Sequence, residues 1–124
     1  VIFAFWDGEE KGLLGSKYFV QTFLEMDKVK GYLNYDMIGR NKDESKPMHV
    51  VYFYTEAHPV FGDWLKNDIK KYGLNLTPDY RPWDKPGRGD GELTLRFALL
   101  DIPVIWYHTD GHPDYHMPSD HVER

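Results

Sequence analysis

The sequence VIFAFWDGEEKGLLGS, residues 1–16, decides the fold of this chain. Its first five residues form an apolar run rich in β-formers, which predicts a buried strand. The run ends in the acidic sequence DGEE, and a glycine-rich turn then leads to Ser16, a residue type that commonly caps helices. Open α/β sheets place their chemistry at the carboxyl ends of strands. Glu9 and Glu10 are therefore candidate functional residues, although such a pair on its own is more often a solvated acidic loop.

Length and composition exclude several classes of protein. The 124 residues allow one domain with a sizeable core, and the formal net charge of −5 gives no electrostatic footprint for nucleic acid, so we expect no nucleic-acid partner. No apolar run reaches the length of a membrane span. With no cysteine, any metal has to be held by histidine and carboxylate. Because the chain begins with Val1 in a strand-like run, we interpret it as a piece of a longer protein.

Strand-like and helix-like patterns alternate along the chain. Helices are predicted over residues 17–26, 59–72 and 92–100, the second with Pro59 in its first turn and Gly73 as its C-cap. Further strands are predicted over residues 31–38, 48–54, 74–80 (broken at Pro78) and 102–107, with loops over residues 39–47 and 81–91. This alternation predicts an α/β fold, a three-layer sandwich with a mixed, mostly parallel sheet and helices on both faces.

Three of the predicted strands are followed by side chains that commonly bind metals. The first leads to Glu9 and Glu10, the second carries Asp36, and the last leads to a loop with His108, His112 and His116. Carboxylate and imidazole without thiolate are the ligands of catalytic zinc sites and two-metal hydrolases. Each residue also has an ordinary interpretation, since Asp36 can cap a loop and His116 can be a surface histidine. The joint occurrence at three strand ends favours a metal site.

The roles of His108 and His112 stay open at this stage. His49 and His58 lie in contexts that indicate exposure, and we assign them no role.

Three motifs resemble those of a known family, the co-catalytic di-zinc aminopeptidases of the twenty-eighth metallopeptidase family. FWDGEEKGLLGS resembles the Glu-Glu signature of these enzymes, NYDMIGR resembles their next strand, and HPDYHMPSD resembles their C-terminal histidine motif. The motifs occur in the family's order and cover both ends and the middle of the chain. The resemblance thus implies a peptide substrate and the fold of a zinc exopeptidase.

The resemblance also implies individual roles. Glu9 would be the general base that deprotonates a metal-activated water, Glu10 and His116 would bind one zinc ion, and Asp36 would bind a second. A further histidine and a bridging aspartate lie upstream of the Glu-Glu signature in the family. Residues 1–124 would then form a partial catalytic domain that lacks N-terminal strands and a closing C-terminal helix. From this we expect weak zinc binding, little peptidase activity and self-association of the isolated chain.

Two other functions remain open from the sequence. One is a glutaminyl cyclase, which shares the fold but uses one zinc, and the other is a non-catalytic binding domain. The GLLGS turn and the DMIG strand end resemble the peptidases more closely, and a dead site has no reason to keep its base. The resemblance favours an extracytoplasmic or secreted location. The preferred N-terminal residue of the substrate and the role of residues 81–91 are not given by the sequence.

Overall fold

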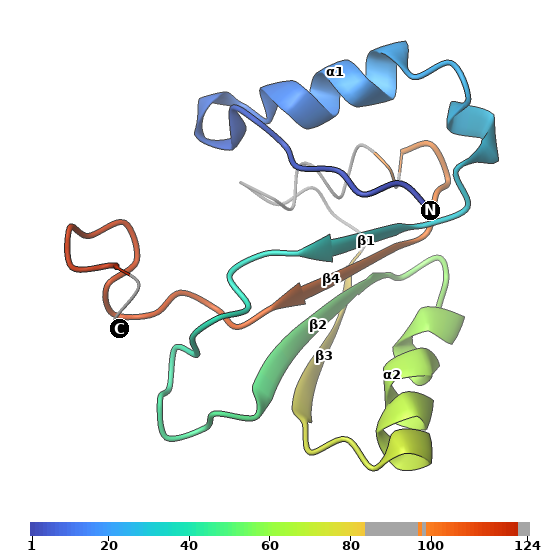
Figure 1. Ribbon diagram of the computed structural model, residues 1–124. Coiled ribbons are helices and arrows are strands. Elements are labelled where there is room, and N and C mark those ends of the chain that lie inside the picture. The colour runs from blue at the N-terminus through green and yellow to red at the C-terminus, as the bar shows by residue number, and fades with distance from the viewer. Residues whose placement is uncertain (84–96, 98, 122–124) are drawn as a thin grey trace.

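The computed structural model describes residues 1–83, 97 and 99–121 (Figure 1). Within these residues the regular elements are four strands, two α-helices and two short 3₁₀ turns: β1 (Tyr32–Tyr35), β2 (His49–Thr55), β3 (Thr77–Trp83), β4 (Val104–His108), α1 (Leu14–Thr22), α2 (Val60–Tyr72), η1 (Glu9–Lys11) and η2 (Met26–Lys28). No helix among these residues is long and apolar enough to cross a membrane.

The four strands form one mixed sheet in the order β1-β4-β2-β3. β1 pairs with β4 in parallel, with Tyr35 opposite Tyr107, and β2 pairs with β3 in parallel. The central pair, β2 and β4, is antiparallel. The predicted mixed, mostly parallel sheet is confirmed. Because β1 and β4 run in the same direction, their carboxyl ends lie at one edge, which brings the segments after them together.

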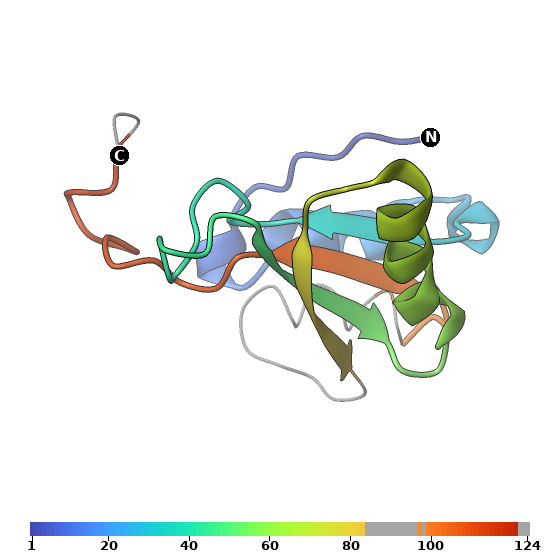
Figure 2. The same cartoon turned by 90° about the horizontal axis from the view of Figure 1, so that it is seen from below.

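The two helices lie on opposite faces of the sheet, and each covers its own apolar cluster (Figures 1 and 2). On the α2 face, Tyr52 and Ile105 pack with Leu65 of the helix. On the α1 face, Val104 packs with Phe97 and Ile102, and Phe19 and Val20 of α1 pack against this cluster. Alternate residues of a strand point to opposite faces, so neighbouring residues such as Val104 and Ile105 serve different clusters. This arrangement confirms the layered α/β class.

β3 is an edge strand that contains two prolines. Thr77 donates its backbone N–H to the carbonyl of Met48, so Thr77 and every second residue after it point their N–H groups toward β2. Pro78 and Pro82 occupy the alternate positions, where no donor is needed. The predicted break at Pro78 was wrong for this reason. The strand continues through Arg81 to Trp83, so the predicted loop begins later than residue 81.

The first apolar run does not form the predicted strand. Residues 1–6 have no regular structure, and Phe3 and Phe5 are 87% and 96% exposed. A strand needs a hydrogen-bonded neighbour, and none of the four strands pairs with this run. Trp6, at its end, is tied down, because its indole nitrogen donates to the Tyr32 hydroxyl at 3.0 Å and its ring lies 5.3 Å from that of Phe19. The run has β propensity but lacks a partner strand among the residues that the structure describes.

α1 begins earlier than predicted, and Ser16 is not its cap. Ser16 lies inside the helix, fully buried, and its hydroxyl donates to the carbonyl of Leu13 at 3.1 Å. The first turn is stabilised by the preceding loop, since Leu14 N–H donates to Gly8 O and Gly15 N–H donates to Asp7 O. These backbone bonds satisfy donors that a capping side chain otherwise serves. The helix ends at Thr22 rather than at residue 26.

The remaining boundaries agree more closely with prediction. α2 follows Pro59 and ends at Gly73, which adopts the left-handed conformation with φ 63°. β1, β2 and β4 lie within or overlap the predicted strands, and β1 is shorter because Met37 adopts a left-handed φ of 51°. The loop over residues 39–47 has no helix or strand. Most of the helix expected over residues 92–100, and residues 84–91 of the predicted loop, lie outside the described residues.

Candidate functional site

Glu9 and Glu10 begin a 3₁₀ turn that joins the N-terminal segment to α1. Gly12 closes this turn at φ 98°, a conformation that side chains other than hydrogen rarely allow. Gly15 packs directly on the chain before the turn: a Cβ atom there would lie 2.8 Å from the backbone nitrogen of Asp7. The glycines of the GLLGS sequence therefore fix the two glutamates against the start of α1.

Asp36 directly follows β1, and His108 is the last residue of β4. These strands are adjacent and parallel, and the two side chains meet with Asp36 Oδ2 3.2 Å from His108 Nε2. The backbone N–H of Asp110 donates to His108 Nδ1 at 2.7 Å. In neutral imidazole the proton then resides on Nε2, where it faces Asp36. His108 thus orients the carboxylate of Asp36.

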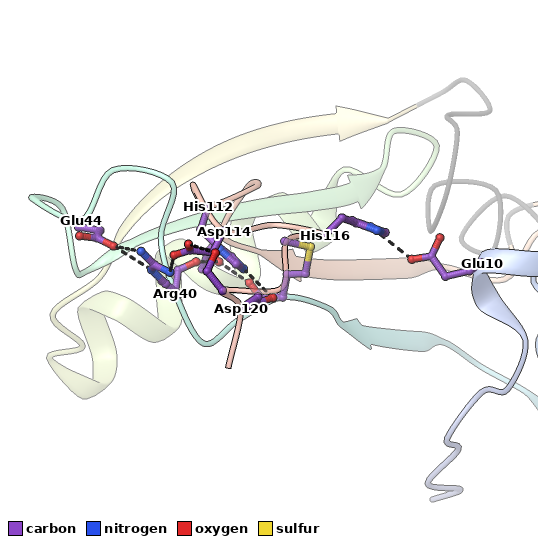
Figure 3. Close-up of polar contacts among 10 residues, drawn as sticks. Glu10, Arg40, Glu44, His112, Asp114, His116 and Asp120 are labelled. Carbon is purple, nitrogen blue, oxygen red and sulfur yellow. Dashed lines mark hydrogen bonds and ion pairs between the residues drawn. The ribbon is translucent and has the colours of Figure 1, made fainter. Parts of the chain in front are cut away.

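His116 reaches Glu10 from the loop after β4. Its Nε2 lies 3.3 Å from Glu10 Oε1, and Figure 3 shows the two side chains pointing toward each other from separate segments. His116 is about half-exposed, and Glu10 is more exposed still. The structure therefore brings together two of the residues that the sequence singles out, although more than a hundred positions separate them.

Glu9 differs from its neighbour in its surroundings. It is half-buried, whereas Glu10 is exposed. Its side chain makes no hydrogen bond or ion pair with the residues that the structure describes, while Glu10 faces His116. The two neighbouring glutamates therefore differ both in burial and in their contacts.

The loop that carries His116 is a tight turn tied to the loop after β1. Asp114 accepts a hydrogen bond from Arg40 Nη1 at 2.5 Å and one from the Ser119 hydroxyl at 2.5 Å. Inside the turn, His112 Nε2 lies 3.6 Å from Asp120 Oδ2 (Figure 3). The hydrogen bonds with Asp114 and then Glu44 raise the pKa of Arg40, which keeps the guanidinium charged.

The donor atoms agree with zinc in kind but not in number. Glu10 and His116 offer an oxygen and a nitrogen donor, and Asp36 offers a second carboxylate, all of which zinc accepts. Both ring nitrogens of His108 are already engaged, by the Asp110 N–H and by Asp36. Within residues 1–83, 97 and 99–121, no three such side chains converge as a metal site requires. Zinc sites commonly have three or four protein ligands. The described residues therefore do not form a complete zinc site.

Two residues were not identified from the sequence as parts of the site. The sequence does not assign a role to His108, although its position at the end of a predicted strand is a signal that it can meet Asp36, which lies at the end of another. Arg40 gave no signal, because its partner Asp114 lies 74 positions away. His112, also left open, pairs with Asp120 inside the turn and does not reach Glu10 in this arrangement.

Comparison with known proteins agrees with the motifs. The sequence is 54% identical over 105 residues to leupeptin-inactivating enzyme 1 of Streptomyces exfoliatus, covering 82% of this chain and 21% of that protein. It is 52% identical over 112 residues to probable leucine aminopeptidase 2 of Aspergillus oryzae, covering 83% and 21%. The chain thus spans about a fifth of the length of these curated relatives.

The fold is also similar to a solved structure, the LapA aminopeptidase of Legionella pneumophila. The TM-score is 0.71 at 27% sequence identity, and the match covers 96% of this chain and 32% of LapA. Over its whole length, residues 1–124, the sequence matches Peptidase family M28. The chain belongs to this peptidase family.

Proposed function

We propose that this chain is part of the catalytic domain of a zinc-dependent aminopeptidase that removes N-terminal residues from peptides. The observation that carries the proposal is the meeting of Glu10 and His116 at 3.3 Å beside Glu9, a carboxylate on the same turn that no described residue pairs. A ligand pair next to such a carboxylate is the arrangement that metal-assisted hydrolysis needs. Membership of Peptidase family M28 supports a peptide substrate.

In this proposal the two neighbouring glutamates have different tasks. Glu10 and His116 hold one zinc ion, and Asp36, oriented by His108, holds a second. When bound, zinc supplies Lewis-acid polarisation of the scissile carbonyl and lowers the pKa of water. The carboxylate of Glu9 accepts the proton of the attacking water and passes it to the leaving amine nitrogen. These residues supply two ligands to one ion and one to the other, fewer than zinc sites commonly have. We therefore expect the 124-residue chain by itself to bind zinc weakly and to hydrolyse little.

Leucine is the first substrate residue to test. The relative from Aspergillus oryzae is named a probable leucine aminopeptidase, and this chain shares about half of the matched residues with it. A glutaminyl cyclase and a binding domain are less well supported, because the similar proteins cited above are named as peptidases or enzymes. We also propose an extracytoplasmic location, which the motif resemblance favours and which cell fractionation tests.

The first experiment replaces the proposed base in the full-length protein. We expect Glu9→Gln to lower kcat for a leucyl anilide by about 10²–10⁴-fold, because an amide cannot accept the proton. Zinc content, measured by mass spectrometry, is expected to stay unchanged. In Glu10→Gln the zinc content itself is expected to fall, because an amide oxygen is a weaker ligand than carboxylate.

Glu25→Gln is the matched control, since Glu25 is exposed and pairs locally with Lys28. Full activity in Glu9→Gln would contradict the proposal. Cyclisation of peptides with N-terminal glutamine, without anilide hydrolysis, would favour the cyclase instead. Bound zinc without either reaction would favour the binding domain.

A further inference from the structure

The proposed ligand His116 has a backbone that is unfavourable on its own. Its φ is 59°, in the left-handed region that a histidine adopts only at a cost of about 1–3 kcal/mol. Its side chain is about half-exposed, so burial does not fix the ring. Residues in such conformations persist where the surrounding structure holds them. The contacts that hold the turn therefore decide where the imidazole points.

Asp114 is the anchor of this turn. Its backbone carbonyl accepts the N–H of Met117 at 2.8 Å, which closes the turn around His116. Its two carboxylate oxygens accept from different donors, Arg40 Nη1 on Oδ2 and the Ser119 hydroxyl on Oδ1, each at 2.5 Å. Ser119 lies after His116 and Asp114 before it, so one carboxylate ties both sides of the turn.

Arg40 connects this anchor to the loop that begins at Asp36. Arg40 Nε donates to Glu44 at 2.8 Å, and Nη2 pairs with the same carboxylate. The backbone carbonyl of Arg40 accepts a hydrogen bond from the buried Thr109 hydroxyl at 2.7 Å. Arg40 is thus fixed at its backbone and at its guanidinium, and it bridges the segments after β1 and β4 (Figure 3).

The two ion pairs of Arg40 are not equivalent. In the pair with Asp114 the side chains are 21% and 17% exposed, whereas Glu44 is 62% exposed. Exposed pairs contribute little because water screens them, and shielded charge-assisted bonds are stronger. The ion pair with Asp114 therefore does more than the pair with Glu44 to hold Arg40 and the turn of His116 in position.

We propose that Arg40 is a positioning residue that, through Asp114, holds the turn of His116 and so sets the zinc affinity of the proposed site. The inference rests on the proposed function, because it takes His116 as a ligand. Arg40 does not touch the substrate or the reacting atoms in this assignment. Residues that orient metal ligands in this way affect metal affinity by about 10–100-fold.

The test uses Asp114→Asn in the full-length protein. The amide keeps the size of the side chain but removes its negative charge, so the charge-assisted hydrogen bond with Arg40 is lost even though the amide oxygen still accepts and its NH₂ group can donate to Ser119. We expect the zinc Kd to rise by about 10–100-fold and kcat to recover at saturating zinc. We also expect faster hydrogen–deuterium exchange over residues 112–120 of the zinc-free protein.

Two further variants complete the design. Glu44→Gln is the matched control, because it alters the other, exposed partner of Arg40, and we expect its zinc Kd to match that of the wild type. Arg40→Gln combined with Asp114→Asn is expected to be no worse than either single variant, since both remove the same contact.

An unchanged rate of hydrogen–deuterium exchange over residues 112–120 in zinc-free Asp114→Asn would overturn the proposal, and this measurement does not depend on zinc binding. Faster exchange with an unchanged zinc Kd would also overturn it, because the turn would then not position a ligand. Failure of the wild-type full-length protein to bind zinc would overturn the proposed function and the positioning role together. That outcome differs from the others because the wild type itself fails.

Discussion

Tyr107 on β4 shows how a half-buried phenol links this fold to pH. Its ring packs against the cluster of Tyr52, Leu65 and Ile105 and stacks on Tyr35 with centroids 5.1 Å apart. Burial, followed by the neighbouring Tyr35, raises the pKa of Tyr107 to about 12. The phenol thus retains its proton in the folded chain at a pH where the unfolded chain, with a pKa of about 10, has lost it.

The sign of the pH dependence follows from this difference. Between about pH 10 and 12 the unfolded state binds fewer protons than the folded state, so the free energy of unfolding falls as pH rises. Below about pH 10 the contribution of Tyr107 is fully present. We expect Tyr107→Phe to flatten this alkaline slope in urea unfolding followed by circular dichroism.

Tyr18→Phe is the matched control, because the ring of Tyr18 is 70% exposed. An alkaline slope in Tyr107→Phe equal to that of the wild type would contradict the assignment. Burial also raises the pKa of Tyr52, in the same direction. The slope is therefore expected to be reduced by Tyr107→Phe and not abolished.

At the level of residues, the sequence predicts individual positions better than it predicts their partners. The pairing of Glu10 with His116 and the location of Asp36 at a strand end follow from motifs that can be recognised locally. The contact between Arg40 and Asp114 does not, because it depends on how two loops from parallel strands lie side by side. The left-handed backbone of His116 is likewise set by these distant contacts, since the residue itself disfavours it.

The link between η1 and α1 depends on one close contact between backbones. A Cβ on Gly15 would lie 2.8 Å from the nitrogen and 2.9 Å from the oxygen of Asp7, and Gly15 N–H donates to that oxygen at 2.8 Å. Backbone atoms cannot move aside as the end of a flexible side chain can. The helix and the Glu-Glu turn therefore keep their relation only while residue 15 is glycine.

This contact predicts a measurable cost for one added methyl group. We expect Gly15→Ala to lower the free energy of unfolding by about 1–3 kcal/mol, because overpacking forces the backbone apart. Gly39→Ala is the matched control, since a Cβ added at Gly39 would have no atom of the described residues within 4 Å. Urea midpoints at neutral pH compare the two variants. Equal midpoints for Gly15→Ala and Gly39→Ala would show that the contact with Asp7 does not constrain the turn.

Elements whose signals are local were predicted well, and elements that need a partner were not. α2 is bounded by Pro59 and Gly73, and its apolar face repeats at helical spacing, so the sequence contains the whole signal. Residues 1–6 have the composition of a strand, yet no strand of the sheet pairs with them. β3 tolerates Pro78 and Pro82 because it is an edge strand, which only the topology reveals.

Among the residues that the structure describes, many large apolar side chains are exposed. Val1, Phe3 and Phe5 are exposed at one end, and Leu33 and Tyr35 are 57% and 61% exposed on β1. β1 is also an edge strand of the sheet, so one side of its backbone has no strand neighbour in the part of the chain that the structure describes. Exposed apolar side chains beside an open strand edge promote association between chains.

We therefore expect the isolated 124-residue chain to self-associate, with a weight-average mass that rises with concentration in sedimentation equilibrium. Leu33→Lys is expected to reduce this association, because a charge on an edge strand opposes pairing with another copy. Gln21→Lys, which adds the same positive charge at an exposed position of α1, is the matched control. A constant monomeric mass at every concentration would contradict the prediction. Unchanged association in Leu33→Lys would indicate that the chains meet through the apolar N-terminal segment and not through β1. The double variant Phe3→Ser, Phe5→Ser would then test that segment.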